Sequence, residues 1–533
     1  WYRRSFSLER VQNQDWWLCF DAVDYKAEVW LNGYFLGSHE GGYTGFDYCL
    51  STLPEGVLVS GDNELVVRVI DQDWNNGLTD DDIHIKETLA GFVQDTRKLN
   101  YCGIWQNVYL EARGTVLSQD LFVETLDIAS GAVQVGVTLV NAQAQPRTVT
   151  VKTAVADGPS AENTYTAPAC GTLPVTMQMT IANPHLWTAN DPYRYTLTAT
   201  VTDGDSVDSL SQKFGIRTVA VEGTKVLVNG EAVFLTGMLH WGSYYDNYTP
   251  AVSMEQIRKE ITALKEDGFN AIKYCLLSPP NYVLELCDEL GMYVYIEYPI
   301  WNVTESAAFF ERAYLQMMEM VVKDRRFASV IMTDFNCEDL EFTPEMDQLM
   351  KWCVETAKDV APNRLYTDNS SNGEHRYGNF ATCHPYYQVN CYEDMLNGWI
   401  QKRGDQPLIL GEFADISVLR DLTDLKEKES PDYSWYHDYY QDYDQAAIMR
   451  EFGYSEEEIT RIIGQSVLNA QELRKYYIEA SKKNNHVAGL FLTHICESPN
   501  GWADGWFDDL GEKHFDPDVI RPAAGENALL FER

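Results

Sequence analysis

Two short apolar runs of this sequence each end at a glutamate. Residues 407–414 read PLILGEFA and contain Glu412, and residues 329–338 read SVIMTDFNCE and end at Glu338. An apolar run of this length between polar residues is typical of a buried parallel strand. Burying a carboxylate at the end of such a strand costs free energy unless the group has partners or a chemical role. Two carboxylates delivered by strand ends predict a hydrolase, provided that the chain builds a barrel around them.

The second half of the chain has the alternating pattern that such a barrel requires. After residue 217, apolar runs that indicate strands alternate with segments of helical period, such as the helix predicted after a capping box at Ser253 and Gln256 and ending at Gly268. Eight strand candidates occur, at 233–239, 269–274, 292–297, 329–335, 364–369, 379–386, 407–413 and 486–493. This count predicts a (β/α)8 TIM barrel over 218–533, with Glu338 after strand four and Glu412 at the end of strand seven. Both carboxylates then face the C-terminal mouth of the barrel.

The first 217 residues predict two β-sandwiches. Residues 1–115 contain short alternating runs and an Asn32-Gly33 hairpin signal, which favour a β-sandwich. Residues 116–217 contain plainer strands rich in Thr and Val, which fit an immunoglobulin-like β-sandwich that acts as a spacer. The chain is therefore predicted to be multidomain, with a first β-sandwich, an immunoglobulin-like β-sandwich and a barrel. A second Asn-Gly turn, Asn229-Gly230, opens the barrel segment.

Composition excludes several classes of partner. The formal net charge is −39, which argues against nucleic acid and against anionic membrane surfaces, because both bind basic surfaces. No run of eighteen apolar residues occurs, and the first residues lack the apolar core of a signal peptide. Eleven cysteines are scattered without a CxxC pair, which favours reduced thiols in a cytoplasmic protein. A homo-oligomer is a modest expectation.

Other catalytic chemistries find no support in the sequence. The ten histidines are dispersed, and neither HExxH nor a Cys/His cluster with zinc spacing occurs, so no metal is expected. No GxSxG elbow follows a strand, and the chain contains no phosphate-binding loop or dinucleotide fingerprint, so no cofactor is expected.

Taken together, these segments resemble glycoside hydrolase family 2, the family of β-galactosidases, β-glucuronidases and β-mannosidases. The resemblance covers nearly the whole chain, and it implies that residues 1–115 form the family's sugar-binding jelly-roll. It rests on WYRRSF, VWLNGYFLGSHEGGYTGF and GIWQNVYLEA in the first domain, on FGIRTV and VLVNGEAVFLTGMLH at the passage into the barrel, and on SVIMTDFNCE and LILGEF. Because WYRRSF normally lies inside the first domain of the family, the resemblance implies that the first strands of this domain are missing here.

The resemblance implies a retaining mechanism with two carboxyl groups about 5–5.5 Å apart. Glu412 would attack the anomeric carbon, and Glu338 would protonate the leaving oxygen and then deprotonate water. The pKa of Glu338 should then be raised while Glu412 stays ionised. Asp334, Asp339 and Glu341 lie near Glu338 in the sequence and compete for its role.

Three departures from the family pattern concern the sugar site. Cys337 stands where the family usually has an Asn that contacts the sugar 2-hydroxyl, and a local shift could let Asn336 replace it. Thr333 replaces a common Trp of strand four, and strand eight reads LTHICE without its usual Trp. The sugar specificity of well-known members therefore does not carry over to this chain.

Further residues at predicted strand ends are candidate substrate contacts. His240 and Trp241 follow strand one and could line the sugar pocket, although core packing is nearly as good an account of Trp241. His384 ends strand six and could contact a hydroxyl or a carboxylate, or be a structural histidine. The other candidates are Asp368 and Asn369 after strand five, Tyr386 as a hydrogen-bond partner of the nucleophile with Tyr387 as its competitor, and Trp506 after strand eight, more often pocket wall than contact.

A long connection after strand seven, residues 417–456, is rich in aromatic and acidic side chains. It is expected either to form part of the cleft wall or to be a packing insertion. The resemblance implies an exo-acting β-glycosidase, with β-galactosides first among its substrates because this is the commonest activity of such proteins. β-Glucuronides come second, because no Asn-x-Lys element of the kind that binds the glucuronate carboxylate occurs and the net charge of −39 does not help an acidic substrate. β-Mannosides, an arabinoside and an inactive carbohydrate-binding protein remain alternatives.

Overall fold

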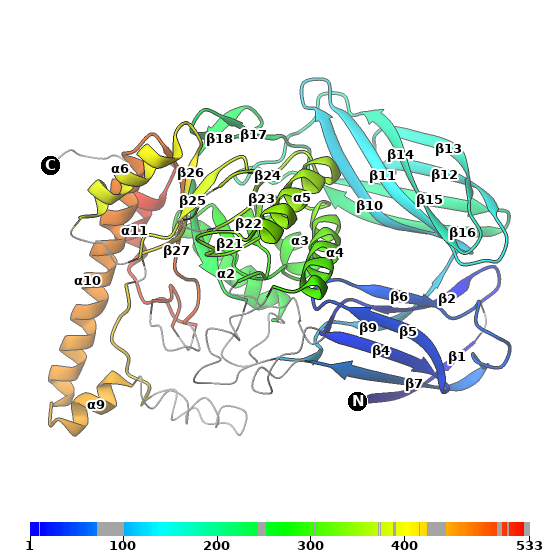
Figure 1. Ribbon diagram of the computed structural model, residues 1–533, viewed down its shortest axis with the longest axis horizontal. Helices are drawn as coiled ribbons and strands as arrows, with labels where there is room; N and C mark the ends of the chain where they lie inside the picture. Colours follow the sequence, from blue (N-terminus) through cyan, green and yellow to red (C-terminus); the bar gives the residue numbers. More distant parts are fainter. Residues whose placement is uncertain are drawn as a thin grey trace.

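The molecule consists of two β-sandwiches that lie beside a larger barrel (Figure 1). The computed structural model describes residues 1–9, 11–71, 101–242, 252–301, 305–370, 373, 375–386, 391–414, 416–423, 444–497, 504–508 and 511–526. Within these ranges no helix is both long and apolar enough to cross a membrane.

The first sandwich packs two antiparallel sheets around a small apolar core. One sheet has the order β1 (Tyr2–Leu8), β7 (Gly61–Ile70), β4 (Lys26–Leu31) and β5 (Tyr34–Glu40), and the other has the order β6 (Phe46–Cys49), β2 (Asp15–Phe20) and β9 (Val108–Arg113). A short pair joins β3 (Val23–Asp24) to β8 (Gly103–Ile104). The predicted turn between β4 and β5 is present: Asn32 and Gly33 have φ values of 48° and 79°, as a type I′ hairpin requires.

The second sandwich confirms the predicted immunoglobulin-like domain. One sheet has the order β10 (Val116–Asp127), β11 (Ala132–Asn141) and β14 (Gly171–Thr180). The other sheet has the order β13 (Ser160–Ala167), β12 (Arg147–Val155), β15 (Tyr195–Asp203) and β16 (Ser206–Phe214). Alternate residues of these strands are buried between the sheets, for example Val133, Val135 and Val137 of β11. This alternation follows from the two-residue repeat of a strand.

A buried ion pair joins the two sandwiches. Asp208 of β16 accepts hydrogen bonds from Arg113 of β9, at 2.7 Å from Nε and 2.9 Å from Nη2, and from the backbone N–H and hydroxyl of Ser118. Burial alone would raise the pKa of Asp208, but these hydrogen bonds and the Arg113 charge bring it below its usual value.

Eight parallel strands form the barrel, and all eight were predicted from the sequence. They are β20 (Leu235–His240), β21 (Ala271–Tyr274), β22 (Tyr293–Glu297), β23 (Val330–Asp334), β24 (Leu365–Thr367), β25 (Ala381–Cys383), β26 (Leu408–Phe413) and β27 (Val487–Leu492). A three-stranded sheet of β17 (Val219–Glu222), β18 (Lys225–Val228) and β19 (Glu231–Val233) packs Val226 and Val228 against interior side chains such as Leu235 and Phe491. The N-terminal end of the barrel is thereby closed.

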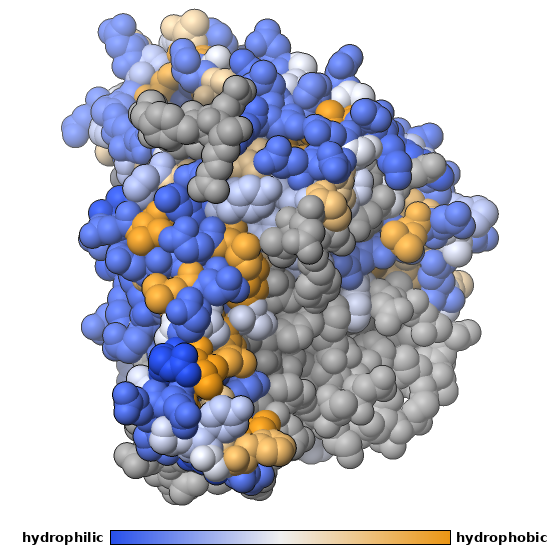
Figure 2. Space-filling model, turned by 90° about the vertical axis from the view of Figure 1, so that its left-hand side faces the viewer, coloured by the Kyte–Doolittle hydropathy of each residue, from blue (hydrophilic) through white to orange (hydrophobic). Residues whose placement is uncertain are grey.

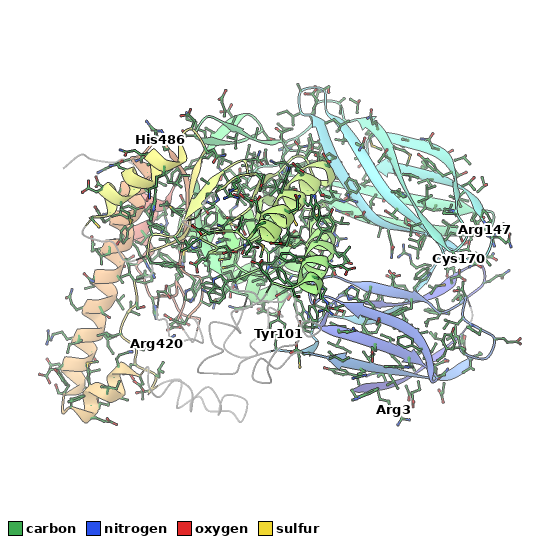
Figure 3. All side chains as sticks on the ribbon, viewed as in Figure 1. Arg3, Tyr101, Arg147, Cys170, Arg420 and His486 are labelled. Atoms are coloured by element: carbon green, nitrogen blue, oxygen red, sulfur yellow. The ribbon has the colours of Figure 1, made fainter. Side chains whose placement is uncertain are left out.

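Helices surround the strands, and side chains fill the space between the two layers (Figure 3). They are α2 (Met254–Glu266), α3 (Asn281–Leu290), α4 (Ala307–Asp324), α5 (Pro344–Val360), α6 (Tyr392–Arg403), α9 (Gln445–Glu451), α10 (Glu456–Lys482) and α11 (Pro517–Ala524). Ser253 caps α2 as predicted by accepting a hydrogen bond from the Gln256 N–H, but the Gln256 side chain bonds to Glu260 instead of closing the capping box.

The long helix α10 extends past the barrel together with α9 (Figure 1). On the face of the molecule that carries these helices, hydrophobic residues lie among hydrophilic ones (Figure 2). Phe452, which follows α9, and Leu468 of α10 have 80% and 53% of their surface exposed. The aromatic part of the predicted strand-seven loop, from Tyr433 to Tyr443, lies outside the described residues.

Candidate active site

The two glutamates singled out in the sequence meet at the C-terminal end of the barrel. Glu412 lies at the C-terminal end of β26 and has 2% of its surface exposed. Glu338 follows β23, and its side chain is 33% exposed. One oxygen of each carboxylate and one nitrogen of His384 all lie within 4.8 Å of one another. Glu338 has a left-handed backbone, with φ of 58°.

His384 lies between the two carboxylates. Its Nδ1 is 2.8 Å from Glu338 Oε1 and 3.8 Å from Glu412 Oε2, and its Nε2 is 3.1 Å from the Ser370 hydroxyl. With 5% of its surface exposed, the imidazole is held by all three groups. Of the two roles open to His384 in the sequence, the structure therefore supports a carboxylate contact.

Tyr386, two residues further along, reaches the predicted nucleophile. Its hydroxyl donates a hydrogen bond to Glu412 Oε2. The strand-six segment thus supplies a partner to each carboxylate, His384 to Glu338 and Tyr386 to Glu412. The competing candidate, Tyr387, lies outside the described residues.

The other oxygen of Glu412 faces a buried group that the sequence analysis missed. Lys273 Nζ is 3.6 Å from Glu412 Oε1, 2.7 Å from Glu297 Oε1 and 3.0 Å from the Ser370 hydroxyl. The Cys275 thiol donates to Glu297 Oε2 at 2.6 Å and lies 3.5 Å from Glu412 Oε1. A lysine inside the otherwise apolar run 269–274 was the available signal, since a buried cation must have anionic partners.

The pKa values of Glu338 and Glu412 are shifted in the directions opposite to those expected. Burial raises the pKa of Glu412, although the charges of His384 and Lys273 oppose this effect. For Glu338 burial acts in the same direction, but the hydrogen bond and charge of His384, together with Trp301, bring its pKa below the usual value. The expected order, with a raised Glu338 and a fully ionised Glu412, is therefore reversed in the protein without substrate.

Tryptophan side chains and a thiol form a wall beside the carboxylates. Trp301 Nε1 donates to Glu338 Oε2 at 3.1 Å. Trp241 packs in one apolar cluster with Trp301, Cys275 and Cys337. Trp241 therefore points into the mouth of the barrel, where the sequence placed it, with 4% of its surface exposed.

Cys337, not Asn336, faces the nucleophile. Isolated parallel bridges join Cys337 to Trp301 and to Ser370, and its sulfur is 3.9 Å from Glu412 Oε1. Asn336 directs its amide to Asp339 Oδ2 at 3.1 Å. The local shift that would let Asn336 replace the family's Asn is therefore absent, and a weak hydrogen-bonding thiol occupies the position.

His240 was placed wrongly among the pocket residues. Its ring stacks on Tyr274, and its donor atoms lie near those of Glu260 on α2 and Cys496, so it faces the helix layer. Successive residues of a strand point to opposite faces, and since Trp241 points into the mouth, His240 points away from it. Burial and, to a smaller extent, the charge of His494 lower the pKa of His240 to about 3.

Two further predicted contacts belong to the protein's framework. Trp506 is fully buried, donates its indole N–H to Asp267 at 2.9 Å and packs on Phe269, so it is a core residue and not a pocket wall. Asp368 is also fully buried and accepts the Arg376 backbone N–H at 2.8 Å. Both predictions of a substrate contact are corrected by these placements.

Asn369 supports the loop that carries Glu338. Its amide donates to the carbonyl of Asp339 at 2.6 Å, and 1% of its surface is exposed. Asn369 therefore lies near the site as predicted, but its amide binds the loop that follows Glu338.

Some of these donors could geometrically hold a cation. Glu338, His384 and Glu412 form one such group, and Cys275, Glu297 and Glu412 form another. In the second group, Lys273 already supplies a positive charge 2.7 Å from Glu297.

Comparison with known proteins agrees with this architecture. The chain is 27% identical over 361 residues to the β-galactosidase BoGH2A of Bacteroides ovatus, covering 64% of this chain and 40% of that protein. It is 26% identical over 398 residues to a β-glucuronidase of Paenibacillus borealis, covering 69% of this chain and 63% of that protein. The chain thus spans less than two thirds of the length of these curated relatives.

Solved structures share the fold at low sequence identity. A β-galacturonidase from Eisenbergiella tayi bound to galacturonate superposes with a TM-score of 0.78 at 17% identity, covering 98% of this chain and 89% of the other. A β-D-glucuronidase from Dictyoglomus thermophilum gives a TM-score of 0.73 at 17% identity, covering 100% and 90%.

Models of one protein family match both β-sandwiches and the barrel. The sugar binding domain of glycosyl hydrolases family 2 matches residues 1–113, the family's central domain matches 116–217, and its TIM barrel domain matches 219–448. With three consecutive domains in this order, the chain belongs to glycosyl hydrolases family 2.

Proposed function

We propose that this protein is a retaining exo-β-glycosidase that removes a terminal sugar through a glycosyl-enzyme intermediate. The observation that carries the proposal is the approach of the Glu338 and Glu412 carboxylates, which have oxygens within 4.8 Å of each other. Retaining enzymes hold their two carboxyl groups about 5–5.5 Å apart, whereas inverting enzymes need about 6.5–9.5 Å to admit a water. The separation in this site favours direct attack by a carboxylate.

Glu412 is the proposed nucleophile because its partners hold both of its oxygens, and the charges of Lys273 and His384 oppose the rise of its pKa that burial causes. The Tyr386 hydroxyl donates to one oxygen, and Lys273 lies 3.6 Å from the other. Substrate binding expels water from the mouth, which strengthens the attraction between the carboxylate and these partners. The bond that forms joins Glu412 to the anomeric carbon as the bond to the leaving oxygen breaks.

Glu338 is the proposed acid and base. His384, 2.8 Å away, can share one proton with this carboxyl group, so that a proton is available to the leaving oxygen in the first step. In the second step Glu338 takes a proton from water, which attacks the anomeric carbon and releases the sugar. The one-third exposure of Glu338 fits this task, because both the leaving group and the water must reach it.

Among sugars we place β-galactosides first and β-glucuronides second. Both names occur among the curated relatives. A glucuronate carboxylate would need a cation, and Lys273, the cation beside the nucleophile, is held by Glu297 at 2.7 Å. The net charge of −39 also disfavours an anionic substrate.

A panel of 4-nitrophenyl β- and α-glycosides tests the proposal, assayed with the wild type and with Glu412→Gln. We expect cleavage of one β-glycoside, lost by several orders of magnitude in the variant, since the nucleophile is then neutral and one bond-forming step is blocked. Cleavage that survives Glu412→Gln would exclude the mechanism. Saturable sugar binding without product from any glycoside would favour the alternative, an inactive carbohydrate-binding protein.

A further inference from the structure

A small cavity lies where the immunoglobulin-like domain meets the N-terminal end of the barrel. Its volume is about 20 Å³, and its lining comes from β10, from residues 214–217 and from the turns that precede β23 and β24. The charged residues of this lining are four arginines and one glutamate, namely Arg217, Arg325, Arg326, Arg364 and Glu124. The lining is therefore positive, although the whole chain has a net charge of −39.

Arg217, in the link between the two domains, is buried and is held by neutral groups. With 5% of its surface exposed, it donates hydrogen bonds to the backbone carbonyls of Ala328 at 2.9 Å, of Val330 at 2.8 Å and of Asn363. Carbonyl oxygens orient the guanidinium but do not balance its charge. Burial and then the positive charge of Arg364 lower the pKa of Arg217 to about 10, so two cations act on each other at this place.

Two further arginines of the lining are in the same situation. Arg364 has 6% of its surface exposed and donates to the Phe327 carbonyl at 3.0 Å. The Nε–H of Arg326 is buried and has no acceptor among the described residues. In that part of the chain, neither these two arginines nor Arg217 forms an ion pair with a carboxylate. A buried cation without an anion is costly, so these groups require a negative partner.

The carboxylates around the cavity do not supply enough negative charge. Asp120 pairs with Arg325, which accounts for the fourth arginine. Asp324 is paired with Lys323, whose Nζ is 2.7 Å away. Three guanidinium charges are therefore left facing one carboxylate of the described lining, that of Glu124.

We propose that this cavity binds one small inorganic anion, of the size of chloride, which joins the immunoglobulin-like domain to the base of the barrel. The volume suits such an ion, since a cavity needs about 10–15 Å³ to hold a single water. A water would accept the free N–H of Arg326 but would leave the charges unbalanced, whereas an anion accepts charge-assisted hydrogen bonds from several guanidinium groups at once.

The site lies at the opposite end of the barrel from the two catalytic carboxylates, because Ala328 and Arg364 precede β23 and β24. Its proposed role is structural, and it is independent of the proposed glycosidase activity. An anion that binds the folded protein alone stabilises it in proportion to its occupancy. The expected signature is a stability that rises with chloride and then saturates.

The test is thermal unfolding of the whole chain at neutral pH and constant ionic strength, with sodium chloride replacing sodium gluconate. Gluconate is too large for the cavity, so it controls for the screening of charges by salt. In the wild type the Tm should rise by about 2–4 °C as chloride replaces gluconate and should then level off. Sodium bromide should act as sodium chloride does.

Two variants should change this response in opposite directions. Arg326→Gln removes one lining charge and should abolish the rise in Tm. Glu124→Gln removes the carboxylate that repels the anion, so half of the rise should be reached at about a fivefold to tenfold lower chloride concentration. Arg461→Gln is the matched control, since Arg461 is exposed on α10, and it should keep the response of the wild type.

Equal changes of Tm in chloride and gluconate, or the same chloride response in Arg326→Gln and the wild type, would overturn the proposal. If Arg326→Gln does not fold, wild-type crystals soaked in sodium bromide decide the question. We expect anomalous density for bromide among the guanidinium groups of Arg217, Arg326 and Arg364, and no such density there would overturn the site. None of these measurements uses glycoside hydrolysis, so a failure of the proposed function would leave the test of the anion site intact.

Discussion

Removing the imidazole between the two carboxylates should change the pH at which the nucleophile ionises. The perturbation is His384→Gln, with His384→Phe as a second variant. Both remove the charge of His384, which lies 3.8 Å from Glu412 Oε2 and lowers the pKa of that carboxyl group, and Gln retains a neutral donor for Glu338. Lys273 is then the cation that remains beside Glu412. The pKa of Glu412, already raised by burial, should rise further.

The size of this rise follows from the distance. Two unit charges about 4 Å apart interact by about 4 kcal/mol at the effective dielectric constant of about 20 that suits proteins. This figure is an upper bound, because water reaches the neighbouring Glu338, whose side chain is 33% exposed. Glu338 also loses its partner and binds a proton more readily, which reduces its repulsion of Glu412. We therefore expect a shift of about one to two pH units, the lower part of the range seen for carboxylates beside a cation.

The assay is the pH dependence of kcat/KM for a 2,4-dinitrophenyl glycoside. This leaving group departs without protonation, so the acidic limb reports the ionisation of the nucleophile in the free enzyme without a contribution from the acid. Both variants should move the acidic limb to higher pH by similar amounts. His486→Gln is the control, since His486 precedes the N-terminal end of β27, at the opposite end of the barrel from the carboxylates (Figure 3).

An acidic limb that stays within a few tenths of a unit of the wild type in both variants would refute this reasoning. It would mean that the charge of His384 does not act on Glu412, or that Lys273 determines the ionisation of Glu412. A shift in His384→Phe but not in His384→Gln would assign the effect to the hydrogen bond on Glu338 instead of to charge.

Three further perturbations test the surroundings of the site and the joint between the sandwiches. Tyr386→Phe removes the hydroxyl donor of the proposed nucleophile, and kcat/KM for the dinitrophenyl glycoside should fall about tenfold to a hundredfold while the fold, followed by circular dichroism, is unchanged. Lys273→Met leaves buried carboxylates without their cation and should lower the free energy of unfolding by about 3–5 kcal/mol in urea titrations, and adding Glu297→Gln should recover part of the loss. Asp208→Asn breaks the buried pair with Arg113. Because the folded pKa of Asp208 is lowered, its contribution is complete above its ordinary pKa of 3.8 and disappears as the pH falls through the folded pKa, so the variant's lower Tm at pH 7 should converge with that of the wild type once the pH lies below the folded pKa.

The fold could be predicted from the sequence because the apolar composition of the strands and the turn-forming residues beside them indicate the same elements. Most of the eight barrel strands lie in apolar runs that begin at Pro or directly after Gly or Asn, and each was found within a few residues of its observed ends. The two Asn-Gly turns have the positive φ values that their residue types predict, 55° and 82° in the case of Asn229 and Gly230. Glu338 and Glu412 could be paired because the C-terminal ends of parallel barrel strands meet at one mouth.

The residues that the sequence misplaced are those whose orientation depends on register or on a loop path. The run 233–239 has one polar residue, Thr236, so it has no alternation to show which of its residues point inward, and His240 was assigned to the wrong face. Trp506 is buried by contacts with Phe269 and Phe515, which strand spacing does not specify. Lys273 was missed because its partners Glu297 and Ser370 are 24 and 97 positions away in the chain.

These partners explain how two similar carboxyl groups can take different roles. Two carboxylates this close cannot both ionise easily, so neighbouring charges must decide which one holds a proton. Tyr386 donates to Glu412 and Lys273 lies 3.6 Å from it, whereas His384 contacts both groups and is closer to Glu338 by about 1 Å. A proton shared by His384 and Glu338 would leave Glu412 as the carboxylate that Lys273 stabilises. The proposed roles of acid and nucleophile follow from this asymmetry of partners, and exchanging the partners would be needed to exchange the roles.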